Sequence, residues 1–308
     1  MSHSERKSGL ILTSASALIW GTVFVSISYG LEYLNPYVLV FMRFFIASIP
    51  VLLAIPLLDK RLEIIRELKR PSNWYVGSLY AFGFVIQYLG QSMTNASDTA
   101  LLSNLSPIIA PVGAYIVLKD KLSKGQKLAL PLGLLGLILV AGPKLSLELS
   151  GFVGDLLLFV TSITVAAFII LSKKMKIETL GASFALLVII TVYLAPVGFL
   201  GGLSLSALES LGTVGWESIL WTAIPCTLIT IAMYLRGLAK ITVSESAILL
   251  LVQVITGLVL ADVILGESLG TYELVGAGIL CVAVLLSSLS LRGKKEKEKA
   301  EVRSVSSS

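Results

Sequence analysis

Five polar or aromatic side chains lie inside long apolar runs, where they could bind a small molecule. They are Trp20, Arg43, Gln87, Asn104 and Gln253. At a rise of 1.5 Å per residue, Trp20 and Gln253 fall near the middle of their runs, and the others about 9–11 Å from one boundary. Polar groups at such depth are costly and persist where they meet water, a ligand or one another. We therefore predict a site for a zwitterionic or partly apolar metabolite. The alternative is scattered structural hydrogen bonds.

Arg43 has two interpretations. It is either a structural arginine, paired with Asp98 or with backbone carbonyls, or a direct contact for an anionic group of a ligand. Asp98, Asp155 and Asp262 fall at the ends of apolar runs, where carboxylates reach water easily, which makes them weak candidates for proton coupling. Coupling to a proton or another ion therefore stays open.

Two prolines interrupt one apolar run. Pro107 and Pro111 remove backbone donors, so the freed carbonyls must find partners or face a water-filled cavity. One interpretation is a hinge in a helix that lines a moving cavity, and the other is a fixed packing bend.

The chain lacks the patterns of common catalytic and metal sites. It has no Walker-type phosphate loop and no nucleophile in a recognisable turn. The single histidine, His3, precedes the first apolar run. Cys226 and Cys281 lie within apolar runs, which favours buried thiols over a disulfide. We predict a protein that is not an enzyme and that needs no metal or other cofactor.

The composition predicts an all-α integral membrane protein. Of the 308 residues 56% are hydrophobic and only 14% charged, against roughly 25% charged in soluble domains. A spanning helix needs about 20 apolar residues, which predicts ten transmembrane helices. The candidate runs are residues 9–31, 36–58, 74–94, 98–118, 126–143, 152–173, 180–202, 216–236, 244–265 and 271–291.

The basic residues predict the orientation. With ten spans and the N-terminus inside, 22 of the 24 Lys and Arg residues fall on the cytoplasmic side. This asymmetry predicts a multi-pass plasma-membrane protein with both termini in the cytoplasm. The asymmetry also explains the net charge of +5, so nucleic acid is not expected as a partner. The expected partners are the lipid bilayer and a small-molecule substrate. The sequence leaves the oligomeric state open.

A stretch of sequence in the first half has a similar copy in the second half. A shift of 147 residues places residues 99–122 on 246–269, and each copy closes with Leu, any residue, an acid, any residue and Leu. The acids are Asp120 and Glu267, which we expect to fix the ends of equivalent helices by pairing with nearby donors. Five spans per half turn the second copy upside down, so we predict two inverted five-helix repeats.

These boundaries divide the chain into four segments. Residues 1–8 form a cytoplasmic leader, 9–143 the first five-helix repeat, 152–291 the second, inverted repeat, and 292–308 a basic cytoplasmic tail. In secondary transporters with inverted repeats, the substrate site lies near the midplane between the repeats.

In its order of motifs the chain resembles the drug/metabolite transporter superfamily, in its EamA-type ten-helix branch. The resemblance covers about residues 9–291, with its best segments in ALIWGTVFVS (17–26), NPYVLVFMRFFIA (35–47), ASDTALLSNLSPIIAPVGAYIVLKDKLS (96–123), GDLLLFVTSITVAAFIILSKKM (154–175) and ESAILLLVQVITGLVLADVILGESLGTYELVGAGILCVAVLL (245–286). Two features depart from the family pattern. Gln253-Val254 replaces the usual proline of the ninth span, and Asp120 replaces the usual glutamate that closes the fourth.

The resemblance implies a secondary transporter that moves small metabolites by alternating access without ATP hydrolysis, often as an exporter of amino acids. It also implies that helices one, three, four, six, eight and nine line the cavity. A passive channel or a lipid scramblase on the same bundle is the alternative. Saturable counterflow separates a carrier from a channel.

Overall fold

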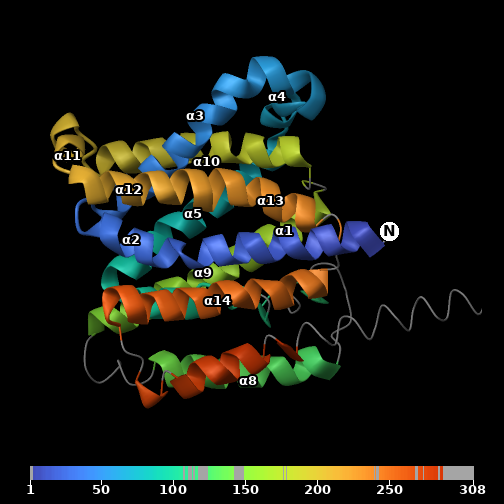
Figure 1. Ribbon diagram of the computed structural model, residues 1–308, viewed down its shortest axis with the longest axis vertical. Helices are drawn as coiled ribbons and strands as arrows, with labels where there is room; N and C mark the ends of the chain where they lie inside the picture. Colours follow the sequence, from blue (N-terminus) through green and yellow to red (C-terminus); the bar gives the residue numbers. More distant parts are fainter. Residues whose placement is uncertain are drawn as a thin grey trace, which may run out of the picture.

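The chain folds into a bundle of helices, most of them side by side along one direction (Figure 1). The computed structural model describes residues 3–106, 108–109, 113, 115–116, 124–141, 149–175, 177, 179–238, 240, 243–267, 270–272, 274–283 and 285–286. Within these residues every regular element is helical, as predicted. The bounds are α1 His3–Gly21, α2 Val23–Leu31, α3 Pro36–Leu62, α4 Ile64–Leu68, α5 Pro71–Met93, α6 Ala96–Leu102, α8 Lys124–Ala141, α9 Leu149–Lys174, α10 Leu180–Leu200, α11 Leu205–Glu209, α12 Gly212–Ala223, the π-helix η2 Ile224–Ile229, α13 Thr230–Leu238 and α14 Val243–Leu265.

Several helices have the length and apolar character needed to cross a bilayer. Five described stretches meet both conditions, and three shorter apolar helices coincide with the fifth, ninth and tenth predicted spans. The five are Glu5–Leu31, Pro36–Leu57, Ser150–Ser172, Leu180–Leu200 and Gly212–Tyr234, and the three are Lys127–Gly136, Val252–Leu265 and Leu274–Ala283. The third predicted span corresponds to α5, which is long enough but more polar than these. The fourth is described only in part.

Short polar segments fix where helices begin. The side chain of Asn35 accepts hydrogen bonds from the amides of Tyr37 and Val38, and Pro36 occupies the first turn of α3, where its missing N–H costs nothing. Asn95 caps α6 through the amide of Asp98 in the same way. These caps satisfy backbone donors that a helix end leaves unpaired.

The packing pairs follow the predicted internal duplication. α5 packs extensively on α9, and the equivalent pair after a shift of half the chain, α13 and α1, also packs together. α1 packs on α14, and the equivalent pair, α9 and α6, is in contact too. This exchange of partners is what a pseudo-two-fold axis between two halves produces.

Three predicted spans differ in detail. The first is broken at Thr22, between α1 and α2. The second continues to Leu62 and stops at Glu63, whose φ of 55° is left-handed, before the short helix α4. The eighth consists of α12, η2 and α13, because the chain winds into a π-helix around Pro225. The last of these irregularities places the side chain of Thr227 beside Arg43 and the carbonyl of Cys226 beside Trp20.

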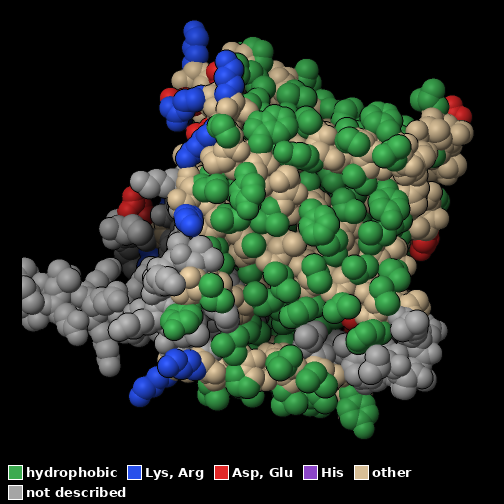
Figure 2. Space-filling view, turned by 180° about the vertical axis from the view of Figure 1, so that it is seen from behind, with side chains coloured by type: hydrophobic (Ala, Val, Ile, Leu, Met, Phe, Trp, Pro, Cys, Tyr) green, Lys and Arg blue, Asp and Glu red, His purple; other side chains and the backbone are tan. Residues whose placement is uncertain are grey.

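Charged and apolar side chains separate along the helix direction. Figure 2 shows a face covered mostly with hydrophobic side chains, with Lys and Arg gathered at one edge beside some Asp and Glu, and with further Asp and Glu at the opposite edge. We call the first edge the basic end of the bundle and the other the acidic end. An apolar belt between two polar edges suits a protein that crosses a bilayer.

Candidate functional site

Arg43 lies at the centre of the candidate site. Its side chain projects from α3 and is only 5% exposed. Its Nε donates to Thr227 Oγ1 at 2.8 Å and its Nη1 to Tyr88 Oη at 3.3 Å. The rings of Phe44 and Phe84 each have their centroid 5.4 Å from the guanidinium carbon, within the range of a cation–π contact. Hydroxyl groups and aromatic rings thus hold a buried positive charge.

The partners of Arg43 differ from one that the sequence suggested. Asp98 does not pair with Arg43. Its Oδ2 instead accepts from Thr94 Oγ1 at 2.9 Å. Among the described residues no carboxylate lies within salt-bridge distance of Arg43. Asp98 and Arg43 do not pair because Asp98 lies in the first turn of α6, at the acidic end, whereas Arg43 lies further into the bundle.

The π-helix η2 contacts both Arg43 and Trp20. Proline has no backbone N–H, so Pro225 interrupts the regular ladder of α12, and Thr227 Oγ1 bonds back five residues to the carbonyl of Thr222 at 2.8 Å. The carbonyl oxygen of Cys226 accepts from Trp20 Nε1 at 2.8 Å. The irregular turn therefore binds Trp20 of the first half through its backbone and Arg43 through a side chain.

Aromatic rings surround this centre. Tyr80 stacks on Phe168 of α9, with 4.0 Å between centroids, and contacts Phe84 at 4.6 Å. Trp20 contacts Tyr234 of α13 at 5.0 Å. The Tyr80 hydroxyl lies within electrostatic range of Arg43 and Tyr234. The rings come from α1, α3, α5, α9 and α13, which join both halves of the chain.

Part of this aromatic surface lies on one face of α5. On α5 the outward face is marked by Tyr75 and Phe82, which are 59% and 57% exposed. At 100° per residue, Tyr80, Phe84 and Gln87 fall on the opposite face. Tyr80 and Phe84 nevertheless remain only half-buried. The two rings therefore face neighbouring helices, and the described residues do not cover them completely.

Two of the predicted amides bond to each other. Gln253 Nε2 donates to Asn104 Oδ1 at 2.9 Å, and Asn104 Nδ2 donates to the carbonyl of Ala100. Gly21, next to Trp20, packs so closely on α14 that an added methyl would lie 2.9 Å from the carbonyl of Gln253. This contact joins the amide pair to the surroundings of Trp20.

The two glutamines of α5 have different surroundings. Gln91 is 3% exposed, and its Nε2 donates to the carbonyl of Phe24 and to Ser28 Oγ. Gln87 is 9% exposed, and its amide makes no hydrogen bond with any described residue. The amide is also not among the fully buried polar atoms that lack a partner, so it keeps some accessible surface. An amide of this kind fits a position that meets water or a ligand. Contacts thus join the surroundings of Trp20 to Asn104 and Gln253, and Gln87 precedes the Arg43 partner Tyr88 on α5. The contact of these residues with a substrate stays a prediction.

Glu267 joins the equivalent helices α14 and α6 at the acidic end. It follows α14, and its two carboxylate oxygens accept from the amides of Ala96 and Ser97 at 3.0 and 2.9 Å and from Ser97 Oγ at 2.9 Å. A carboxylate at a helix N-terminus satisfies unpaired donors and complements the helix dipole. Its matched acid, Asp120, lies outside the described residues, as do the hinge candidates Pro107 and Pro111.

Two further acids at this end are buried, contrary to the expectation that they reach water. Asp98 is 0% and Asp155 2% exposed, and the hydroxyl of Thr94 lies 2.9 and 3.1 Å from one oxygen of each. Because α5, α6 and α9 pack together here, the helix ends are covered by their neighbours. Asp262 is exposed, as expected.

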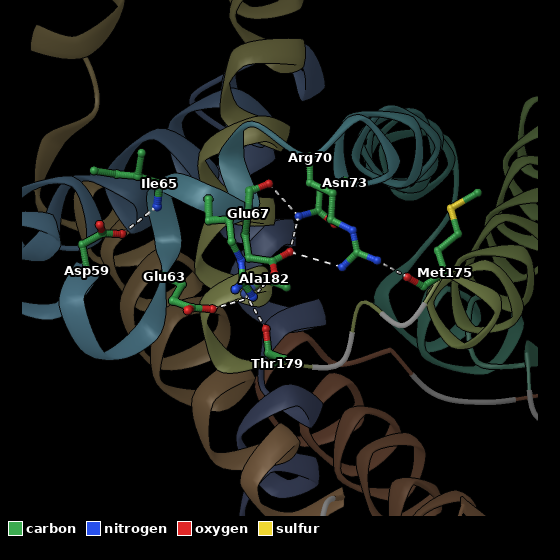
Figure 3. A network of polar contacts seen from close by, with 10 residues as sticks. Asp59, Glu63, Ile65, Glu67, Arg70, Asn73, Met175, Thr179 and Ala182 are labelled. Carbon is green, nitrogen blue, oxygen red and sulfur yellow. Dashed lines mark hydrogen bonds and ion pairs between the residues drawn. The ribbon is translucent and has the colours of Figure 1, made fainter.

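A polar network ties the two halves together at the basic end (Figure 3). Asn73 donates to the carboxylate and the carbonyl of Glu67, which is 3% exposed, and Arg70 lies 3.5 Å from the same carboxylate. Arg70 Nη2 also donates to the carbonyl of Met175 at 2.6 Å, across the boundary between the halves. These contacts position the helix ends and lie away from Arg43.

Several contacts of the site could not be predicted from the sequence. Thr227, Tyr88 and Tyr80 are ordinary residues of apolar runs, and Cys226 acts through its carbonyl and remains a free thiol. Pro225 within the eighth span was the available signal, since proline inside a helix frees a carbonyl. Among the described residues no three His, Cys, Asp or Glu side chains gather as they would around a metal ion.

Comparison with known proteins agrees with this architecture. The model of the EamA-like transporter family matches residues 7–142 and again residues 152–289. The uncharacterized transporter YoaV of Bacillus subtilis (strain 168) is 23% identical over 287 residues, which cover 90% of this chain and 96% of that protein. An uncharacterized transporter of Archaeoglobus fulgidus is 25% identical over 293 residues, which cover 90% and 96%.

Two further comparisons are more limited. The uncharacterized inner membrane transporter YhbE of Escherichia coli (strain K12) is 28% identical over 141 residues, 42% of each chain. A crystal structure superimposes with a TM-score of 0.63 at 15% identity and covers 92% of this chain and 99% of its own. At that identity the likeness shows the fold alone.

Proposed function

Because both of its halves match the family model, the chain belongs to the EamA-like transporter family, and we propose that it exports amino acids or related small metabolites by alternating access, without ATP hydrolysis. It is a multi-pass membrane transporter rather than an enzyme. Export and the amino-acid class rest on the resemblance of its motifs to this family. The proposal also puts the protein in the plasma membrane, with the basic end and both termini in the cytoplasm.

One observation carries the mechanism, namely that the central hydrogen bonds run between the two halves. Trp20 and Arg43 of the first half bond to Cys226 and Thr227 of the second, on a turn that is not regular α-helix. In transporters built from inverted repeats, substrates bind near the midplane between the repeats, beside broken helices. Movement of one half against the other would change these bonds and the access to the site.

The experiment is counterflow in proteoliposomes that contain the purified full chain and are loaded with pooled amino acids and small metabolites. We expect at least one labelled compound to enter transiently against its gradient and with saturable kinetics, because a carrier exchanges bound substrate. Liposomes without protein are the control. Unsaturable flux without counterflow would identify a channel, and movement of labelled lipid alone would identify a scramblase. Either result would contradict the proposal.

A further inference from the structure

Arg43 carries a buried charge that the described part of the protein does not neutralise. The side chain is 5% exposed, and no described carboxylate forms an ion pair with it. Arginine stays charged in proteins, and an uncompensated charge away from water is costly. Neutral hydroxyl groups and ring faces stabilise a guanidinium only in part. This charge therefore favours an anion beside it.

The geometry leaves donors available for such an anion. A guanidinium has five N–H groups, and the hydrogen bonds of Arg43 to Thr227 and Tyr88 use Nε and one hydrogen of Nη1. Nη2 donates to no described residue, and it is not among the fully buried polar atoms that lack a partner, so it keeps some accessible surface. Nη1 and Nη2 together form the edge that binds a carboxylate through two parallel hydrogen bonds.

We propose that Arg43 forms a subsite for the carboxylate of a monoanionic or zwitterionic substrate, with an apolar or aromatic portion held by the surrounding rings. The inference rests on the proposed transport function and names the substrate class of the same site. A single guanidinium balances a single negative charge. The other described Lys and Arg side chains lie near helix ends or in connections, so a phosphate with nearly two charges would remain uncompensated. Phe44 and Phe84 provide ring surface 5.4 Å from the guanidinium carbon, and Tyr80 contacts Phe84.

The test compares benzoate with benzamide, which share a ring and nearly the same size but differ in charge. Thermal unfolding of the purified full chain in detergent is followed as each compound is titrated, because a ligand that binds the folded state raises the midpoint. We expect benzoate to raise the midpoint with at least about tenfold higher apparent affinity than benzamide, as a charge-assisted hydrogen bond predicts.

Variants assign the response to Arg43. Arg43→Gln should abolish the preference for benzoate. Tyr88→Phe keeps the charge and removes the hydrogen bond that orients Nη1 of Arg43. Because a less well oriented guanidinium binds a carboxylate less tightly, we expect about fivefold weaker benzoate binding. Tyr88→Phe also keeps the test valid if Arg43→Gln fails to fold. Arg66→Gln is the control, because Arg66 is 68% exposed at the basic end and should leave the response unchanged.

Three outcomes would overturn the inference. They are equal responses to benzoate and benzamide, no response to benzoate, and a benzoate preference that Arg43→Gln leaves unchanged. If Arg43→Gln does not fold, benzoate binding that Tyr88→Phe leaves unchanged takes the place of the third outcome. Counterflow measured separately distinguishes the two proposals. Counterflow without a carboxylate preference would refute the subsite alone, and a carboxylate preference without counterflow would refute the transport function alone.

Discussion

Replacing Glu267 with alanine is expected to lower the free energy of unfolding by about 2–4 kcal/mol. The carboxylate accepts three hydrogen bonds from Ala96 and Ser97, which are 0% and 1% exposed, and each buried donor left without a partner costs about 1–3 kcal/mol. The measurement is thermal or denaturant unfolding of the purified variant in detergent. Glu267→Gln should show a smaller loss, because its amide keeps one acceptor oxygen.

Glu209→Ala is the matched control for this prediction. Glu209 is an exposed acid at the end of α11, and we expect a change within about 0.5 kcal/mol. If Glu267→Ala unfolds like the parent, the carboxylate does not hold α14 and α6 together.

Replacing Gly181 with alanine is expected to have an even larger effect on folding. Gly181 lies in the first turn of α10, and an added methyl would overlap the backbone carbonyl of Leu62 at the end of α3. Overpacking against side chains costs about 1–3 kcal/mol, and backbone atoms yield less easily, so we expect a loss of more than about 3 kcal/mol or no folded protein. The yield of monodisperse protein and its thermal midpoint measure the effect.

The same substitution at Gly278 is the control. Among the described residues no atom outside its own helix backbone lies within 4 Å of a methyl added there, and the residue is exposed within a helix. Alanine is favoured over glycine inside a helix by about 0.5–1 kcal/mol, so Gly278→Ala should be neutral or slightly stabilising. A Gly181→Ala variant as stable as the parent would mean that α3 and α10 are further apart than the structure shows.

Much of the fold could be predicted because the bilayer fixes the length of an apolar run. Most of the apolar helices, the helix start at Asn35-Pro36 and the internal duplication were visible in the sequence, and the two family matches agree with the duplication. The break at Thr22 and the π-helix at residues 224–229 were not predicted. Such irregularities depend on bonds made to other helices, and the sequence of one helix does not contain them.

The sequence indicates how deep the candidate residues lie in their apolar runs, but it does not identify their hydrogen-bond partners. Shared depth pointed to Asn104 and Gln253, and the structure shows that they bond to each other. Depth could not show that Arg43 would bond to Thr227 and Tyr88, since hydroxyl-bearing residues are common in apolar spans. It also placed Asp155 near water, whereas the packing of neighbouring helices buries it.

The most direct test of the central site compares the two glutamines of α5 by counterflow and thermal unfolding. Gln87 makes no hydrogen bond to a described residue, whereas Gln91, one turn further along, bonds to the carbonyl of Phe24 and to Ser28. Gln87→Ala should therefore raise the half-saturation constant about fivefold and leave the thermal midpoint nearly unchanged, since it removes a contact to substrate of about 1 kcal/mol. Gln91→Ala should lower the midpoint and leave the half-saturation constant nearly unchanged. If Gln87→Ala transports with the parent's half-saturation constant, the substrate does not bind at this site.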